Sequence, residues 1–337
     1  VYRRQRQMGI RDRALSFLRP RRLALACAGL CVFTAQAQVN MADSALLAQN
    51  LRAPSLSETV VAATRMQQPL SDLVADVSIV DRDSIERSGA TGLGDLLARL
   101  PGVEMSRNGG PGTTTSLFLR GAESRFTAVY IDGVRMDSQS TGGAAWESIP
   151  LGLIDRIEVL RGPAGAVYGS DARGGVIQIF TKRGEKGFAP FVSVGVGNRG
   201  TTKLEAGVSG ASGTVDYALG LLRDDSDGFN ARPIAGQNPD RDGYRNQSLS
   251  LQGGYRFNQR RDGELRVFRA EGRNEYDGSL NNEADTVQQV VGGRVRYAPG
   301  DRLRFTASVG ASADLSENFL NGVYSSNFDT RRRLGSL

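Results

Sequence analysis

The sequence predicts an α+β domain, with a mixed sheet and short helices, followed by the N-terminal part of a transmembrane antiparallel β-barrel. Two observations predict this fold class. Residues 66–184 combine short apolar segments with the i, i+3, i+4 spacing of amphipathic helices. After Gly187 the helical spacing disappears, and long segments alternate apolar and polar residues, as strands with one apolar face do.

The first 37 residues have the pattern of a secretory signal peptide. Basic residues at 19–22 precede an apolar run at 23–33, and Ala35-Gln36-Ala37 gives an A-x-A cleavage pattern before Gln38. The apolar run is too short to cross a bilayer as a helix. We therefore expect residues 1–37 to be a leader that directs export.

Charge and composition exclude several classes of function. The 337 residues carry a formal net charge of +6, which at first favours a nucleic-acid partner. Residues 1–37 hold eight arginines and one acid, however, so the remaining chain is close to neutral and we expect no nucleic-acid partner. Histidine is absent, and Cys27 and Cys31 both lie in the leader, which excludes Ser-His-Asp and Cys-His catalysis from the exported chain. We expect no enzyme.

Residues 38–65 separate the leader from the α+β domain. Residues 38–56 are small and polar and are typical of a flexible linker. The stretch LSETVVAATR at 56–65 follows, with an isolated β-prone patch, Thr59-Val60-Val61, and no predicted partner strand nearby.

The α+β domain is predicted over residues 66–184. A helix is expected at 81–87, and leucines at 93, 96, 97 and 100 predict a second helix that Pro101-Gly102 ends. Asp132-Gly133 is expected to form a hairpin turn. Short strands are predicted at 77–80, 103–105, 116–120, 128–131, 156–160 and 176–181.

Period-2 segments from residue 188 predict barrel strands. The clearest are 249–257 and 303–311, joined alternately by tight turns and by long loops at 224–242 and 276–286. Such a sheet must close in lipid, because an open edge leaves unpaired backbone groups. Residues 188–337 supply seven strands and the start of an eighth at 326–337, too few to surround the preceding domain, so we expect a barrel truncated in this sequence.

The glycine-rich stretch RGPAGAVYGSDARGG at 161–175 follows a predicted strand, as phosphate-binding loops do. It lacks the G-x-x-x-x-G-K-[ST] pattern, and Lys182 lies beyond the next strand. We expect its glycines to serve close packing, with Pro163 opening a single helical turn.

Four motifs identify a family by resemblance. LPGVEM, LFLRGAESRFTAVYIDGVRMD and IDRIEVLRGPAGAVYGSDARGGVIQIFTKRG resemble, in order and spacing, the plug domain of TonB-dependent outer-membrane receptors, and LSETVVAATR resembles the TonB box before it. The resemblance covers residues 57–184. Within the family, ETVVAATR, NGGPGTTTSLFLRG and RGPAGAVYGSDARGGV look most like the cobalamin receptor branch.

The resemblance implies an α+β plug domain inside a 22-stranded barrel. TonB, energised by an inner-membrane complex, would bind the box at 57–64 by adding a strand to its own sheet edge. A first plug strand is the alternative for this segment. The expected TonB-binding residues are Glu58, Thr59, Val60, Val61, Ala62 and Ala63.

Ligand contacts are expected at three plug apices rich in small polar residues, which let a bulky polar ligand approach the backbone. Ordinary solvated loops are the alternative. The candidate residues are Asn108, Gly109, Gly110, Thr113, Thr114, Ser124, Arg125, Ser138 and Ser140.

Two further sets of residues have roles implied by the family. Arg120 and Arg161 would pair with barrel glutamates and lock the plug to the wall; exposed loop arginines are the alternative. Asp240, Asp242, Asp277 and Asn230 would bind Ca²⁺, which prefers clustered oxygen ligands; solvated loop carboxylates are the alternative.

The sequence therefore predicts a monomeric receptor in the bacterial outer membrane, in contact with its lipid. It would bind a large scarce ligand, a corrinoid such as cobalamin, and import it with energy relayed by TonB. A ferric siderophore receptor and an inactive fragment of such a receptor are the alternatives. A passive channel is disfavoured because it needs neither plug nor TonB box.

Overall fold

The computed structural model describes residues 59–60, 62, 68–72, 75–138, 142–234, 240–300 and 302–337. The predicted leader and most of the linker lie outside these residues. None of the helices in the described residues is long and apolar enough to cross a membrane. The elements before residue 182 are β1 (Thr59–Val60), β2 (Gln68–Pro69), η1 (Leu70–Asp72), β3 (Asp76–Val80), α1 (Arg82–Arg87), α2 (Leu93–Leu97), β4 (Val103–Arg107), β5 (Thr115–Leu119), η2 (Ser124–Phe126), β6 (Thr127–Ile131), β7 (Val134–Arg135), η3 (Trp146–Ser148), η4 (Leu151–Leu153), β8 (Ile154–Arg161), α3 (Gly165–Tyr168) and β9 (Gly175–Thr181).

A five-stranded mixed sheet forms the centre of the plug, with strand order β3-β8-β9-β6-β7. Only β6 and β9 run parallel; the other neighbours are antiparallel. β4 and β5 form a separate hairpin. The predicted mixed sheet with short helices is confirmed, and each predicted strand agrees with an observed strand to within two residues at either end.

Local sequence explains where these elements begin and turn. Asp81 caps α1 by accepting a hydrogen bond from the backbone N–H of Ser84 at 2.8 Å. Asp132 and Gly133 have φ values of 52° and 83°, the left-handed pair that a two-residue hairpin requires, and they join β6 to β7 as predicted. Leu93, Leu96 and Leu97 are buried on α2.

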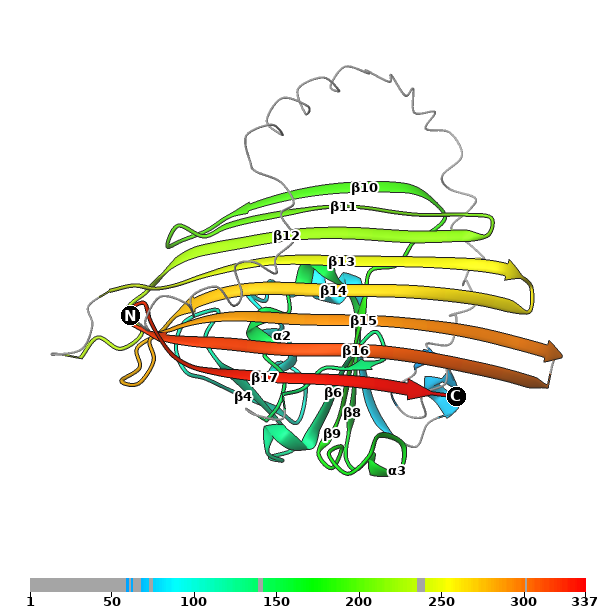
Figure 1. Ribbon diagram of the computed structural model, residues 1–337, viewed down its shortest axis with the longest axis horizontal. Helices are drawn as coiled ribbons and strands as arrows, with labels where there is room; N and C mark the ends of the chain where they lie inside the picture. Colours follow the sequence, from blue (N-terminus) through cyan, green and yellow to red (C-terminus); the bar gives the residue numbers. More distant parts are fainter. Residues whose placement is uncertain are drawn as a thin grey trace, which may run out of the picture. The chain divides into compact units, whose positions relative to one another are not determined.

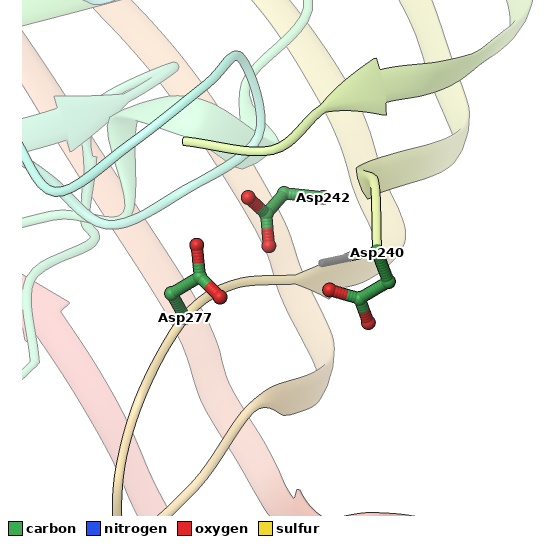
Figure 2. A group of neighbouring side chains, drawn as sticks. All are labelled: Asp240, Asp242 and Asp277. Atoms are coloured by element: carbon green, nitrogen blue, oxygen red, sulfur yellow. The ribbon is translucent and has the colours of Figure 1, made fainter. Parts of the chain in front are cut away.

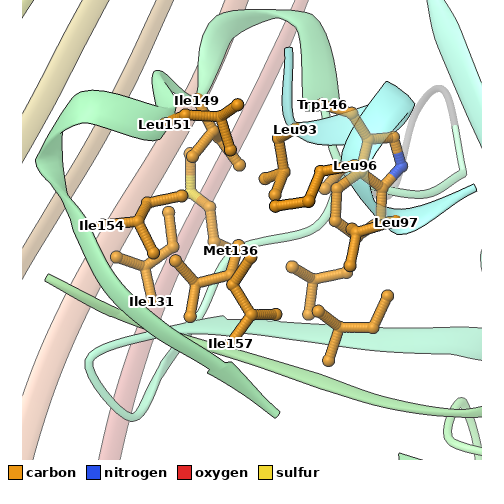
Figure 3. Close-up of a cluster of buried hydrophobic side chains, with 14 of the residues drawn as sticks. Leu93, Leu96, Leu97, Ile131, Met136, Trp146, Ile149, Leu151, Ile154 and Ile157 are labelled. Atoms are coloured by element: carbon orange, nitrogen blue, oxygen red, sulfur yellow. The ribbon is translucent and has the colours of Figure 1, made fainter. Parts of the chain in front are cut away.

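Apolar side chains from the helices and from the sheet meet in one core (Figure 3). The labelled residues include Leu93, Leu97 and Trp146 on one side and Ile131 and Ile157 on the other. The same cluster extends to the barrel wall, because its members include Leu222, Phe268, Ala270 and Val290. Plug and wall therefore share a continuous apolar core.

The barrel part is an antiparallel sheet of eight strands in sequence order (Figure 1). Its strands are β10 (Gly187–Val196), β11 (Thr202–Ser212), β12 (Val215–Phe229), β13 (Asp242–Asn258), β14 (Arg261–Glu275), β15 (Glu283–Gly300), β16 (Leu303–Leu320) and β17 (Val323–Ser336). The sheet is open among the described residues, with β10 and β17 at its edges.

The predicted alternation places apolar side chains outward and polar side chains inward. On β13, Ser248, Ser250 and Gln252 are buried toward the plug, whereas Leu251 and Tyr255 are exposed on the opposite face. Aromatic rings gather near the short turns, where Tyr255 packs on Phe257 and Tyr297 packs on Phe305. This arrangement is typical of a lipid-facing barrel wall with an aromatic girdle.

Two predictions are corrected. The strands are longer than the period-2 segments indicated: β12 runs to Phe229 and β13 begins at Asp242, so the expected loop at 224–242 is reduced to residues 230–241. Cross-strand pairing continues past the apolar zone, where both faces are polar and alternation in the sequence fades. Thr59-Val60, for which no partner was predicted, pairs with Gln68-Pro69 as β1–β2.

Candidate functional site

Three carboxylates meet at the end of the barrel sheet that carries the longer loops (Figure 2). Asp240 and Asp242 stand at the start of β13, and Asp277 follows β14. One oxygen from each lies within 4.8 Å of the others. Asp242 is buried, and Oδ2 of Asp277 is buried without a hydrogen-bond partner among the described residues. These hard oxygen donors, gathered despite their mutual repulsion, fit a calcium ion.

Described residues of the loop before β13 contact this cluster. The backbone N–H of Ala231 donates to Oδ2 of Asp242 at 2.7 Å, and the side-chain oxygen of Asn230 accepts the N–H of Arg232 at 2.9 Å. The predicted calcium residues thus come from two loops far apart in the sequence. The structure brings the three aspartates together, and Asn230 begins the turn beside them.

The plug apex at residues 108–114 packs against the base of the same loop. A side chain at Gly110 would meet the ring of Phe229, and one at Gly112 would meet Tyr244, so glycine allows the close approach. The side-chain amide of Asn274 donates to the carbonyl of Gly112 at 2.8 Å. This apex therefore lies next to the carboxylates.

The other apex candidates differ in exposure. Asn108 and Thr114 are exposed, whereas Thr113 is buried and donates its hydroxyl to the carbonyl of Gly110 at 2.7 Å, which shapes the loop. Ser124 and Arg125 pack against Gly143 and Gly142 respectively. Ser138 is buried, with its hydroxyl oxygen 3.5 Å from that of Thr330 on β17, and Ser140 lies outside the described residues. The described residues of the three apices contact different neighbours, and residues 108–114 contact Phe229, Tyr244 and Asn274.

The described part of the predicted TonB-box segment is docked on the plug. Val60 and Ala62 are buried, and the backbone N–H of Ala62 donates to Oε2 of Glu158 at 2.7 Å. Arg156, paired with Glu158 at 2.8 Å, also donates to the carbonyl of Thr59 at 3.2 Å. Glu58, Val61 and Ala63 lie outside the described residues. The sequence analysis did not single out Glu158 or Arg156. One signal was present, because Glu158 lies among the apolar residues of IDRIEVL and an acid is unusual in a buried strand.

The two predicted locking arginines share a partner within the plug. Arg120 pairs with Asp76, and Arg161 pairs with Asp76 at 3.1 Å and donates to the hydroxyl of Ser78 at 2.9 Å. Nε and Nη2 of Arg161 are buried without a hydrogen-bond partner in the described part of the chain. Pairing of these arginines with barrel glutamates stays a prediction.

Ion pairs that the sequence did not reveal join plug and wall. Arg266 on β14 pairs with Asp132 in the β6–β7 turn, and both side chains are almost fully buried. Arg332 on β17 pairs with Asp137 at 2.8 Å, next to Arg135 at 2.6 Å. All four groups lie on strands or turns whose pairing cannot be read from one sequence. The β6–β7 hairpin is thus tied to the wall at two points.

Glu147 on η3 has an altered acidity. Its Oε2 accepts the backbone N–H of Thr115 at 3.2 Å. Burial raises the pKa of Glu147 from its ordinary 4.5 to about 8, and the nearby charge of Asp314 acts in the same direction. Glu147, which lies beside Thr115 in the plug, is therefore protonated near neutral pH.

Comparison with known proteins now defines the class of protein. Residues 69–176 match the family model of the TonB-dependent receptor plug domain. The chain belongs to the TonB-dependent receptors, which are β-barrel proteins of the outer membrane. Its relatives are receptors and transporters, in agreement with the prediction that it is not an enzyme.

The sequence relatives support the cobalamin branch within this family. The chain is 34% identical over 251 residues to the vitamin B12 transporter BtuB of Vibrio vulnificus, covering 73% of this chain and 40% of that protein. It is 31% identical over 318 residues to BtuB of Photobacterium profundum, covering 93% of this chain and 50% of that protein. The chain therefore spans half or less of the length of these curated relatives.

Solved structures show the same fold at lower identity. A mutant ferric enterobactin receptor of Pseudomonas aeruginosa superposes with a TM-score of 0.64 at 19% identity, covering 82% of this chain and 46% of that one. The ferric-catecholate import receptor Fiu of E. coli K12 gives a TM-score of 0.61 at 15% identity, covering 80% and 45%. These likenesses carry the fold alone.

Proposed function

We propose that the protein is a receptor that binds cobalamin or a related corrinoid and imports it into the periplasm with energy relayed by TonB. The observation that carries this proposal is the identity of 31–34% to vitamin B12 transporters over 251 to 318 residues. The residues Thr59, Val60 and Ala62 support a role for TonB. They are held to the plug by the burial of Val60 and Ala62 and by hydrogen bonds to Glu158 and Arg156, and the strand at Thr59–Val60 pairs with only two residues, so its backbone could pair instead with another sheet edge.

Uptake by cells tests the proposal. Cells that rely on this receptor should accumulate labelled cobalamin and not a labelled ferric siderophore, which is the ligand of the alternative. Val60→Pro should abolish uptake while leaving cell-surface binding intact, because proline removes a backbone donor from the segment that TonB would pair with. Ser55→Pro, in the linker, is the matched control and should preserve uptake. Uptake that survives Val60→Pro would contradict energised transport.

A calcium ion at the outer loops forms the second part of the proposal. Asp240, Asp242 and Asp277 would hold it, with Asn230 as a further oxygen donor, and the ion would fix the loops beside residues 108–114. The mutual closeness of the three carboxylates supports this role, because their repulsion is relieved by a cation.

Removal of one ligand tests the calcium site. Asp277→Asn should weaken calcium binding about tenfold or more and lower ligand affinity in parallel. Chelation with EGTA should lower the affinity of the unmodified receptor to the level of the variant. Asp83→Asn, an exposed aspartate on α1, is the control. Equal calcium binding by Asp277→Asn and the unmodified receptor would refute the site.

A further inference from the structure

Two short turns of the wall, which join β13 to β14 and β15 to β16, carry an excess of positive charge. Residues 256–262 and 296–304 contain six arginines and two aspartates, a net charge of +4. The turn between β11 and β12, at residues 213–214, contains no charged residue. The excess is therefore a local feature of two neighbouring turns and not a property of every short turn in the wall.

Arg260 links these two turns. Its Nη1 donates to the carbonyl of Pro299 at 3.1 Å, so the side chain crosses from the first turn to the second. Its own carbonyl accepts the backbone N–H of Ala298 at 2.8 Å, which fixes the residue against the end of β15. Arg302 follows three residues after Pro299, in the second turn, and both arginines are exposed. Two guanidinium groups thus lie at the same turn.

Arg261 adds a third guanidinium on the lipid-facing side. Its central carbon lies 4.7 Å from the ring centroid of Tyr297. The Tyr297 ring in turn stacks on Phe305, with centroids 6.5 Å apart and planes at 20°. Both rings are exposed on the outward face of the sheet. A guanidinium that lies over a ring keeps the N–H groups at its edge available for hydrogen bonds.

Carboxylates of the described residues do not neutralise this group. Asp262, the acid of the first turn, pairs with Arg296 at 2.8 Å. Within the described part of the chain, no ion pair involves Arg260, Arg261 or Arg302. Three exposed arginines beside an aromatic surface are therefore available to an anion from outside the chain.

We propose that Arg260, Arg261 and Arg302, with the rings of Tyr297 and Phe305, bind an anionic phospholipid of the inner leaflet of the outer membrane. Short turns of bacterial outer-membrane barrels lie on the periplasmic side, and aromatic girdles lie at the level of the lipid headgroups. The lipid phosphate would accept hydrogen bonds from the guanidinium groups, whose planar geometry suits phosphate, while the acyl chains lie along the two rings. The site does not depend on which ligand the receptor transports.

Quenching by brominated lipids tests the site. Phe305→Trp places a fluorescent ring on the outward face, whereas the chain's own tryptophan, Trp146, is 1% exposed in the plug. With the receptor in phosphatidylcholine bilayers, brominated phosphatidylglycerol should quench this reporter with an affinity about tenfold or more above that of brominated phosphatidylcholine. Equal quenching by the two lipids would overturn the proposal.

Substitutions locate the preference within the wall. Arg261→Gln and Arg302→Gln, each made in the reporter protein, should lower the preference for phosphatidylglycerol about fivefold, the effect of one arginine near an anionic lipid surface. Arg261→Lys should keep most of the preference, because the charge remains. Arg273→Gln, at the outer end of β14, is the matched control and should leave the preference unchanged. Full preference in both glutamine variants at the turns would refute the assignment.

Two further measurements complete the test. Quenching by brominated phosphatidylcholine should be the same in all variants, which shows that the wall has folded and that the reporter still faces lipid. Phosphate buffer in place of Hepes should leave the preference for phosphatidylglycerol intact. Loss of the preference in phosphate would identify a site for free phosphate and overturn the assignment to a lipid.

Discussion

Glu158 places a fully buried carboxylate between Arg156 and the backbone N–H of Ala62. Glu158→Gln keeps an acceptor for Ala62 but removes the charge that pairs with Arg156, and hydrogen bonds to charged groups are stronger than neutral ones. We expect residues 59–63 to detach more often. A cysteine at Ala63 should then react with a polar maleimide about tenfold faster than in the parent protein, as expected for a loss of ~1.5 kcal/mol. Glu104→Gln, on an exposed residue of β4, should change nothing; equal rates in both variants would refute the role of Glu158.

Glu147 links pH to the stability of the plug. Its pKa is raised by burial to about 8, so between pH 4.5 and 8 the folded protein binds a proton that the unfolded chain releases. The free energy of unfolding should therefore fall as pH rises through this window and level off above it. In detergent, the melting temperature of the parent should drop more between pH 5 and pH 9 than that of Glu147→Gln. Glu123→Gln, exposed on the plug, should behave as the parent; identical pH profiles for Glu147→Gln and the parent would contradict this prediction.

The β6–β7 hairpin is the element whose attachment to the wall is easiest to weaken. Asp132→Asn keeps the left-handed backbone that asparagine tolerates, yet it leaves the buried guanidinium of Arg266 with only Glu264, at 3.3 Å. Breaking a buried pair in this way costs about 3–5 kcal/mol. The variant should melt at a clearly lower temperature. Asp171→Asn, half-exposed beside Arg135, should melt within a degree or two of the parent, and a similar loss in both variants would point to a general effect of lost charge.

Elements with strong local signals could be predicted, and elements defined by distant pairing could not. Leucine spacing gave α2, Asp132-Gly133 gave the hairpin turn, and alternation gave the lipid face of β13. β7 was missed because two residues carry no periodicity. The partner of the β-prone patch at Thr59-Val60 was missed because β2 contains Pro69, a residue that disfavours strands.

The site residues could be predicted, or not, for the same reason. Asp240 and Asp242 are near in sequence, and resemblance to the family brought in Asp277. Glu158, Arg266 and Arg332 were not predicted, because their roles depend on which strand each one faces. In an alternating segment, an arginine looks like any other inward-facing polar residue, because the sequence does not show which plug residue it faces.

At the scale of the whole molecule, the ion pairs between plug and wall in the described part of the chain are concentrated at the β6–β7 hairpin. The β6–β7 hairpin and the residues after it carry the ion pairs Arg266–Asp132 and Arg332–Asp137 to the wall, whereas Arg82 and Glu86 of α1 line a cavity. The segment docked by Glu158 precedes β3 in the chain. The polar contacts between plug and wall are therefore unevenly distributed among the plug elements.

The length of β13 determines where ligand capture occurs relative to the bilayer. Tyr255, in the aromatic girdle near the short turns, and Asp242 lie on this one strand, thirteen positions apart, which corresponds to about 43 Å along it. At a strand tilt of about 45°, this corresponds to about 30 Å along the membrane normal, the thickness of the hydrocarbon core. With one aromatic girdle at the inner interface, Asp242 is expected at the outer boundary of the hydrocarbon core. The length of β13 thus sets the distance between the inner interface and the carboxylates that are proposed to bind calcium.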